Sequence, residues 1–245
     1  MDETLWMKRR IFLKTLIIIP AYNESKNIKN VINNIKSTNM EVEYLIVNDC
    51  SIDDTTDVCA SNRYNYISLP VNLGIGGGVQ AGYKYAAYYD YDVAIQMDGD
   101  GQHDANYIKT LLQPIIDDRA DIVIGSRFIT KEGFQSSGIR RFGISFISFL
   151  IKSCCGVKIK DVTSGFRAVN KKFIHIYADE YSQDYPEPEA IISGALNDGR
   201  ICEVPVLMHE RSSGTSTISA WKSVYYMIKV SLAVLIYRLT FQRRS

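Results

Sequence analysis

The first half of the chain alternates short apolar runs with stretches of helical periodicity. Leu16–Ile19 and Tyr44–Val47 are short and apolar, as buried strands are. Between them, Asn23–Ile35 places apolar residues three and four positions apart, which predicts a helix. Further strands are expected at Tyr66–Leu69, Val93–Met97, Ile122–Ile124 and Ile201–Met208, and further helices at Asp53–Ala60, Gly76–Tyr89 and Ala105–Ile116. This alternation predicts an α/β fold with a mainly parallel sheet flanked by helices.

The second half of the chain breaks this alternation. Ile139–Cys155 is basic, aromatic and apolar, Thr163–Val169 is expected to be a strand or a turn, and Trp221–Phe241 is expected to be a long amphipathic helix. We expect one domain over residues 1–217 and a C-terminal amphipathic helix over residues 218–245.

Composition limits the class of protein. The 245 residues are 46% hydrophobic and 22% charged, which is ordinary for one folded domain with a substantial core. The formal net charge of +1 gives no reason to expect a nucleic-acid partner.

The cysteines and the apolar runs bear on where the protein works. Five cysteines without metal-ligand spacing fit a reducing compartment. No run reaches the roughly 18 apolar residues of a spanning helix, so we expect a soluble or peripheral protein.

Polar and glycine-bearing clusters follow five of the predicted strands. They are Pro20–Glu24, Asn48–Ser51, Asn72–Gly74, Asp98–Asp100 and Gly125–Arg127. Ligands of open parallel sheets bind at the carboxyl ends of the strands, so these clusters are expected to converge on one site.

Asp98 and Asp100 carry the clearest chemistry in these clusters. Two carboxylates one residue apart repel each other unless a cation lies between them, and oxygen ligands suit Mg²⁺ or Mn²⁺. Such an ion would neutralise a leaving diphosphate. The alternative is a solvated Asp-Gly turn. Asp100 is the better candidate for direct ligation, and Asp98 would contact the ribose or support the metal.

Several motifs together resemble family 2 glycosyltransferases of the GT-A fold. They are IIIPAYNE at residues 17–24, LIVNDCSIDDT at 45–55, NLG at 72–74 and QMDGDGQ at 96–102. DVTSGFR at residues 161–167 is similar to the branch of dolichyl-phosphate mannosyltransferase. The resemblance covers roughly residues 14–217 and implies a GT-A sheet, a nucleotide-diphospho-sugar donor and a metal ion.

The resemblance also implies roles for individual residues on the donor side. Pro20, Tyr22 and Glu24 would line the nucleotide pocket, Asp49 and Ser51 would meet the base or ribose, Asn72 and Gly74 would pass close to the base, and Gly99 would lie between the two metal-site carboxylates. The family usually has two acids in the second motif, whereas this chain has Asn48 at the first position. It also lacks the basic residue that often follows Gly74, so charge at the phosphates would come from elsewhere, such as Arg127.

Arginines are the candidate phosphate contacts. Arg127 could clamp a phosphate with its planar guanidinium or form a structural ion pair. By resemblance, one of Arg140 and Arg141 would lie near the phosphate of the acceptor. Arg167 would orient the acceptor or brace the site.

Glu187 and Glu189 each follow a proline at the start of a predicted helix. Transfer to a sugar hydroxyl needs a general base, and the resemblance favours Glu189 by position, with Glu187 as the alternative. Compensation of the helix dipole is the structural explanation for either residue.

The late chain supplies two more candidates. His209 could be a third metal ligand, and Arg211 a catalytic contact to the diphosphate. These two side chains share one face if the segment is extended. The small residues of the segment 211–216 resemble a loop that closes over the donor.

These observations predict an inverting, metal-dependent glycosyltransferase with a lipid-linked or saccharide acceptor in cell-surface polysaccharide or glycolipid synthesis. If the acceptor is a polyprenyl phosphate, no general base is needed. Nucleotidyl transfer would require a glycine-rich basic loop after the first strand, where this chain has PAYNE. A catalytically silent nucleotide-sugar-binding protein is the third alternative.

The C-terminal helix is expected either to lie in a membrane interface or to pack on the domain or on a second copy in a homo-oligomer. The corresponding location is cytoplasmic, peripheral on the inner face of the cell membrane.

Overall fold

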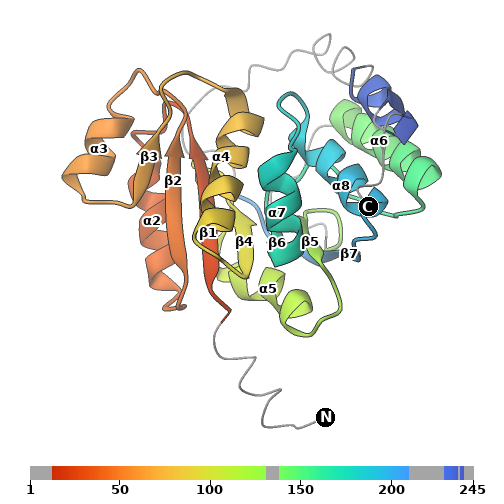
Figure 1. Cartoon of the computed structure of the whole chain (residues 1–245), viewed down its shortest axis with the longest axis horizontal. Helices are drawn as coiled ribbons and strands as arrows, with labels where there is room; N and C mark the ends of the chain where they lie inside the picture. Colours follow the sequence, from red (N-terminus) through yellow and green to blue (C-terminus); the bar gives the residue numbers. More distant parts are fainter. Residues whose placement is uncertain (1–12, 131–137, 210–228, 237, 240–245) are drawn as a thin grey trace, which may run out of the picture.

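The computed structural model describes residues 13–130, 138–209, 229–236 and 238–239. One twisted sheet runs through the molecule and is covered by helices on both faces (Figure 1). This confirms the predicted α/β class with a mainly parallel sheet.

Seven strands form the sheet in the order β3-β2-β1-β4-β6-β5-β7. They are β1 (Thr15–Ala21), β2 (Glu43–Asn48), β3 (Tyr66–Ser68), β4 (Val93–Gln96), β5 (Ile122–Ser126), β6 (Arg167–Asn170) and β7 (Ile201–Pro205). All pairs are parallel except those of β6, which is antiparallel to both of its neighbours. The carboxyl ends of the other six strands therefore share one edge.

The two faces of the sheet carry different helices because side chains alternate along each strand. Ile17 and Ile19 of β1 face a core made with α2 (Ile28–Ser37), α3 (Thr55–Ser61) and α5 (Ile108–Ile116). Leu16 and Ile18 face the opposite core. That core contains α4 (Gly74–Tyr88), α6 (Gly138–Cys155), α7 (Lys171–Asp179) and α8 (Pro186–Leu196). A short 3₁₀ helix, η1, spans Ala105–Tyr107.

The direction of β6 decides where the second half of the chain meets the site. Arg167, its first residue, pairs with Gln96 at the end of β4 and with Ile124 of β5. Because β6 is antiparallel, its start lies at the edge where the neighbouring strands end. The segment 161–166 that leads into β6 is thereby brought to the same edge as Asp98.

The helical residues 229–236 pack on the same core as α6. Val230 and Val234 are fully buried in the cluster that contains Ile144, Ile147 and Ile151 of α6. The rest of the predicted C-terminal helix lies outside the described residues. Across the described part of the chain, no helix combines the length and the apolar character that crossing a membrane requires.

Candidate functional site

A cavity of about 440 Å³ opens at the carboxyl edge of β1, β2 and β4. We call it the donor-edge cavity. It is lined by Pro20, Ala21, Tyr22, Glu24, Asp49, Asn72, Gly74, Ile75, Gly78, Asp98, Gly99 and Asp100. Clusters that are up to 80 residues apart in sequence thus meet in one place. The structure brings together the predicted donor residues except Ser51 and Arg127.

Asp49 shapes one wall of the donor-edge cavity. Its Oδ1 accepts a hydrogen bond from the backbone N–H of Leu73 at 2.7 Å, and its carbonyl accepts one from the Asn72 side chain. The Asn72 side chain also accepts from the backbone N–H of Gly74, whose φ of 74° suits glycine. The buried Asp49 therefore fixes the 72–74 turn that begins α4, beside the space for a ligand.

Ser51 braces the loops without lining the cavity. Its hydroxyl accepts a hydrogen bond from the backbone N–H of Asn23 at 3.0 Å, and the Asn23 side chain accepts one from the N–H of Ile52. These contacts tie the loop after β1 to the loop after β2. In this structure Ser51 positions the loop that carries Tyr22 and Glu24.

Asn48, which stands where the family usually has an acid, is part of the frame. It is buried, and its amide donates to the hydroxyls of Thr56 and Ser68 at 2.8 and 3.2 Å. Its carbonyl oxygen accepts from the N–H of Ser51. An aspartate here would have to accept hydrogen bonds from the same two hydroxyls, whereas Asn48 donates to them and carries no charge into this buried position.

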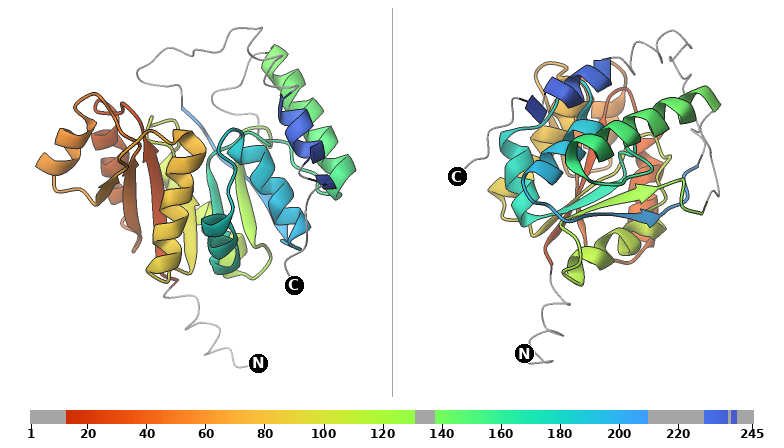
Figure 2. Two further views of the ribbon diagram at one scale, coloured as in Figure 1. Left: turned by 45° about the horizontal axis from the view of Figure 1, so that its top comes forward. Right: turned by 90° about the vertical axis from the view of Figure 1, so that its right-hand side faces the viewer.

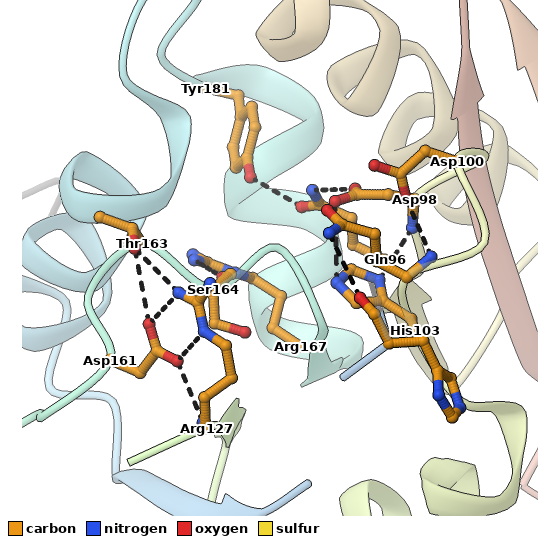
Figure 3. A network of polar contacts seen from close by, with 12 residues as sticks. Gln96, Asp98, Asp100, His103, Arg127, Asp161, Thr163, Ser164, Arg167 and Tyr181 are labelled. Carbon is orange, nitrogen blue, oxygen red and sulfur yellow. Dashed lines mark hydrogen bonds and ion pairs between the residues drawn. The ribbon is translucent and has the colours of Figure 1, made fainter. Parts of the chain in front are cut away.

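The loop that carries Asp98 and Asp100 is held by its own neighbours (Figure 3). The backbone N–H of Asp98 donates to Nδ1 of His103 at 3.0 Å, and the buried His103 ring stacks on Phe166 with centroids 4.8 Å apart. Oδ1 of Asp100 accepts from the N–H of Gln102 at 3.0 Å. The two carboxylates are thus presented on a turn of defined shape.

The Asp98 side chain lies against β6 and the segment before it. Gln96 donates to its Oδ1 at 3.5 Å, and Tyr181 in turn donates to Gln96 at 3.4 Å. A Cβ built at Gly165 would be 3.0 and 3.1 Å from the two carboxylate oxygens of Asp98. A side chain at Gly165 would therefore press on the Asp98 carboxylate and shift it by a few tenths of an ångström.

The chemistry of the two aspartates fits a hard divalent cation. Mg²⁺ is commonly held by one or two carboxylates plus the phosphates of the substrate, without a full protein cage. Asp98 and Asp100 both line the cavity, and the Asp98 side chain is 32% exposed. Within the described ranges, no three His, Cys, Asp or Glu side chains are gathered as a metal cluster. A cation here would depend on the diphosphate for its remaining ligands.

His209 lies beside the aspartate loop without joining its carboxylates in a cluster. Its backbone N–H donates to the carbonyl of Gln102 at 2.8 Å, while its imidazole Nε2 lies 3.7 Å from Asp104. The predicted set of Asp98, Asp100 and His209 is therefore not assembled in this structure.

Arg127 forms a buried ion pair. Its Nε and a terminal nitrogen donate to the two oxygens of Asp161 at 2.7 and 2.6 Å, and the same nitrogen reaches the hydroxyl of Thr163. Asp161 is fully buried, and its backbone N–H donates to Glu203 on β7. The expected contact from Arg127 to donor phosphate has no support here. Its guanidinium binds the carboxylate of Asp161, which is the structural ion pair that the sequence left open as the alternative.

Arg167 is a fully buried bracing residue. Its two terminal nitrogens donate to the backbone carbonyls of Glu187 and Ser164, while its Nε has no hydrogen-bond partner in the described part of the chain. It thereby joins the start of α8 to the loop that supports Asp98.

Glu187 and Glu189 lie in the first turn of α8, which begins at Pro186. Glu189 lines a separate cavity of about 260 Å³ with Tyr177, Glu180 and Tyr181. Burial raises the pKa of the Glu189 carboxyl; a hydrogen bond with the Ser182 side chain partly offsets this, and the negative charge of Asp184 adds a smaller increase. Neither glutamate is among the described residues that line the donor-edge cavity.

The three glycines at the start of α4 separate into two kinds. A Cβ at Gly76 would lie 2.1 Å from the carbonyl of Ser182, and one at Gly77 would lie 2.4 Å from the Leu73 side chain. Tight packing explains these two. Gly78 lines the cavity and has nothing closer than 3.8 Å, so it leaves space for a ligand.

Four positioning residues were not singled out from the sequence: Gln96, His103, Asp161 and Tyr181. Gln96 stands two residues before Asp98, and His103 stands five residues after it. Their closeness to the Asp98–Asp100 motif could have marked them as candidates for supporting residues. Asp161 begins the DVTSGFR motif, but its pairing with Arg127 depends on the fold, and no local pattern reveals Tyr181, which follows α7.

Two of the predicted residues lack a full description. Arg211 and the loop 211–216 lie outside the described residues, as does the side chain of Arg140. The exposed Arg141 side chain lies over the Phe128 ring, with 5.8 Å between the guanidinium carbon and the ring centroid.

Comparison with known proteins places these features in a family. The sequence model described as Glycosyl transferase family 2 matches residues 16–176. UDP-N-acetylglucosamine--dolichyl-phosphate N-acetylglucosaminyltransferase of Methanococcus voltae is 30% identical, over 88% of this chain and 95% of that protein. Polyprenol monophosphomannose synthase of Mycolicibacterium smegmatis is 29% identical, over 89% of this chain and 86% of that protein.

Solved structures show the same fold at low sequence identity. The glucosyl-3-phosphoglycerate synthase of Mycobacterium tuberculosis, in complex with Mn²⁺, UDP and glucosyl-3-phosphoglycerate, matches with a TM-score of 0.71 and 17% identity. The match covers 99% of this chain and 86% of that one. This likeness concerns the GT-A fold.

Proposed function

Because this chain belongs to glycosyl transferase family 2, we propose that it moves a sugar from a nucleotide-diphospho-sugar to the phosphate of a polyprenyl phosphate. The observation that carries the proposal is the donor-edge cavity, which gathers the family motifs and ends at two carboxylates. Similarity to two enzymes named for transfer to lipid phosphates supports the choice of acceptor.

On the donor side, the cavity would hold the nucleoside diphosphate. The walls formed by Tyr22, Asp49 and Asn72 would receive the base and ribose, and Asp98 and Asp100 would hold Mg²⁺ or Mn²⁺ against the diphosphate. The ion would supply charge neutralisation for the leaving nucleoside diphosphate. His103, through the backbone of Asp98, keeps the carboxylates at the mouth of the cavity.

On the acceptor side, the nucleophile would be an oxygen of the lipid phosphate. It attacks C1 of the sugar from the face opposite the leaving group and inverts the anomeric configuration. A phosphate is already anionic, so the step needs no general base. The position of Glu187 and Glu189 away from the donor-edge cavity supports an acceptor of this kind.

A basic approach for this phosphate would run along the start of α6. The Arg141 guanidinium lies over the ring of Phe128. The guanidinium carbon of Arg127, at the end of β5, lies 5.4 Å from the centroid of the same ring. Arg127 is paired with Asp161, so Arg141 and its neighbour Arg140 are the proposed contacts for the acceptor phosphate.

The test is a transfer assay with two classes of acceptor. The double variant E187A/E189A should transfer sugar to a short-chain polyprenyl phosphate within about threefold of the unchanged protein. A loss of 10²-fold or more, the range expected for a missing general base, would contradict a phosphate nucleophile and favour a sugar hydroxyl. Circular dichroism and thermal unfolding of the variant check that α8 still forms.

The expected location is the cytoplasmic face of the cell membrane, with peripheral attachment. A lipid phosphate presents its reactive oxygen at the bilayer surface, so the enzyme would work there.

A further inference from the structure

The carboxylate of Asp98 has a neighbouring side chain beside each of its oxygens (Figure 3). The amide of Gln96, the last residue of β4, donates to Oδ1 at 3.5 Å, and Nε2 of His103 lies 3.7 Å from Oδ2. Nδ1 of His103 accepts the backbone N–H of Asp98, so the neutral ring carries its proton on Nε2. Both oxygens of Asp98 therefore have an N–H group next to them.

A tyrosine hydroxyl sets the direction of the Gln96 amide. An ionised carboxylate only accepts hydrogen bonds, so the amide nitrogen of Gln96 has to face Asp98 and its oxygen has to face away. That oxygen accepts from the hydroxyl of Tyr181 at 3.4 Å. Without this donor, the amide could turn over and place its oxygen against the carboxylate. We call the chain of contacts from Tyr181 through Gln96 to Asp98 the tyrosine relay.

Tyr181 is held in place and keeps its proton. It is buried, and its ring packs against the rings of Tyr83 and Tyr177, with centroids 5.4 and 5.3 Å away. Burial, more than any neighbouring group, raises the pKa of its hydroxyl well above the usual range, so the hydroxyl stays a donor.

The segment that carries Tyr181 is fastened to α4, which begins at the donor-edge cavity. The Gln80 amide of α4 donates to the carbonyl of Ala178 at 3.2 Å, and the Gln183 amide donates to the Gln80 side chain at 3.1 Å. The backbone of Ser182 lies directly against Gly76. The tyrosine relay thus starts from a fixed position beside the cavity.

The packing around the relay leaves room for these contacts and for little else. A Cβ at Gly165 would lie 3.1 Å from the amide nitrogen of Gln96 and equally close to the oxygens of Asp98. The two hydrogen bonds of the relay are at the long end of the usual range. They are therefore suited to orienting the carboxylate and add little to the stability of the fold.

We propose that Gln96 and Tyr181 are positioning residues that orient the Asp98 carboxylate toward a divalent cation in the donor-edge cavity. Hydrogen bonds to a ligating carboxylate fix its orientation before the ion arrives, so less freedom is lost on binding. The inference rests on the proposed function for one point, the cation at Asp98. It assigns control of metal affinity to two side chains that are not among the described residues lining the cavity.

The experiment is isothermal titration of the full chain with UDP, GDP and dTDP, each with and without Mn²⁺. The measured quantity is the Mn²⁺ effect, the ratio of the dissociation constant without the ion to that with it. The nucleotide with the largest Mn²⁺ effect in the unchanged protein is then used for the variants. We expect the Mn²⁺ effect to fall at least about tenfold in Q96M and at least about threefold in Y181F. The affinity without Mn²⁺ should stay within about twofold in both.

Two tyrosines of the same cluster provide matched controls. The hydroxyl of the buried Tyr177 donates to the carbonyl of Ala190 at 2.7 Å, away from the relay. The hydroxyl of the fully buried Tyr83 has no hydrogen-bond partner in the part of the chain that the structure describes. Y177F should lower the thermal unfolding temperature and Y83F should change it little, and both should keep the Mn²⁺ effect of the unchanged protein.

A double variant tests whether Tyr181 acts through Gln96. If it does, Y181F/Q96M should show the same Mn²⁺ effect as Q96M alone, because the tyrosine has nothing left to orient. Losses that add in the double variant would overturn the relay. So would a Y181F protein with the Mn²⁺ effect of the unchanged protein, or a Y177F protein that loses as much of it as Y181F.

The unchanged protein separates failure of this inference from failure of the proposed function. If it binds none of the three nucleotides in a Mn²⁺-dependent way, the metal site of the proposed function is rejected, and the relay is rejected with it. A Mn²⁺ effect that is present in the unchanged protein and fully kept in Y181F and Q96M rejects the relay alone. The expected losses in these variants, without sugar transfer to any polyprenyl phosphate, would uphold the relay and reject the proposed acceptor.

Discussion

Asp98 and Asp100 are held by different parts of the protein. Asp98 rests on Gly165 and accepts from Gln96, so its carboxylate depends on the second half of the chain. Asp100 is buried and accepts from Gln102 within its own turn. Both line the donor-edge cavity. A substitution at either residue should therefore weaken the metal-dependent part of donor binding more than the metal-independent part.

The variant D100N should lose the Mn²⁺-dependent part of its affinity for a nucleoside diphosphate, with a dissociation constant at least about tenfold higher. The reason is that an amide is a weaker ligand for a hard cation than a carboxylate. Isothermal titration with and without Mn²⁺ measures the effect. The control is D104N, which removes a carboxylate from the same loop outside the cavity, and an equal loss there would contradict the assignment.

The pKa of Glu189 gives a second prediction at this scale. Burial raises the pKa of this carboxyl in the folded state, so its contribution to stability is present below the ordinary value of about 4.3 and is lost as the pH rises through the folded pKa. The variant E189Q should therefore gain stability relative to the unchanged protein between pH 4 and pH 7. Urea unfolding at the two pH values measures this, and a relative loss at pH 7 would show that the carboxylate makes a stabilising contact.

Most residues of the donor-edge cavity were predictable because they stand in short motifs near the ends of strands. The role of Arg127 was not, because its partner Asp161 is 34 residues away and only the fold brings the two together. The structure also separates Gly78, which lines the cavity and has free space beside it, from Gly76 and Gly77, which pack tightly; the sequence shows three identical residues.

At the scale of elements, the Arg127–Asp161 pair joins the end of β5 to the segment before β6. Breaking a buried pair by removing one partner leaves an uncompensated charge and costs about 3–5 kcal/mol of stability. R127A should show this loss in urea unfolding, while the affinity of the folded protein for donor nucleotide stays within about threefold. Replacing both residues, as in R127M/D161L, should recover part of the loss. A strong and selective loss of donor affinity in R127A would restore the phosphate-contact hypothesis.

A second ion pair joins the starts of β5 and β7 at the opposite edge of the sheet. Hydrogen bonds from Arg200 lower the pKa of Asp121, so the pair stabilises the protein above the ordinary aspartate pKa of about 3.9 and ceases to do so as the pH falls through the lowered value. D121N should be less stable than the unchanged protein at pH 7, with the difference shrinking toward pH 2 in chemical denaturation.

Asp118 provides the matched comparison for Asp121. It contacts the same Arg200, but its side chain is 89% exposed, so D118N should change stability much less. Equal effects of the two variants would contradict the role given to burial.

Most elements could be predicted because their periodicity is strong, but the segment 163–169 was predicted only as a strand or a turn, and the direction of β6 was not predicted. It has four residues, and its direction is decided by its two neighbours. That direction matters for function, since it places Gly165 and Arg167 at the donor edge. For α6 the sequence indicated an apolar helix, while the division into a buried isoleucine face and an exposed phenylalanine face required the packed structure.

At the scale of the whole molecule, one sheet brings both halves of the chain to the same edge. The donor-edge cavity lies at the carboxyl ends of β1, β2 and β4, and the antiparallel β6 starts beside the end of β4 (Figures 1 and 2). The Arg141 side chain of α6 lies over the ring of Phe128, which follows β5, so α6 is tied to the same edge.

The two relatives named above differ in the sugar that their names give, so the donor has to be found by experiment. The most direct test of the central claim incubates the protein with Mn²⁺, a polyprenyl phosphate and each of a set of UDP-, GDP- and dTDP-sugars, followed by mass spectrometry of the lipid. We predict that one donor yields the lipid phosphate enlarged by one sugar residue, in a reaction that needs the divalent cation and is lost in D100N. Donor binding without any glycosylated lipid phosphate, across the whole set, would contradict the account.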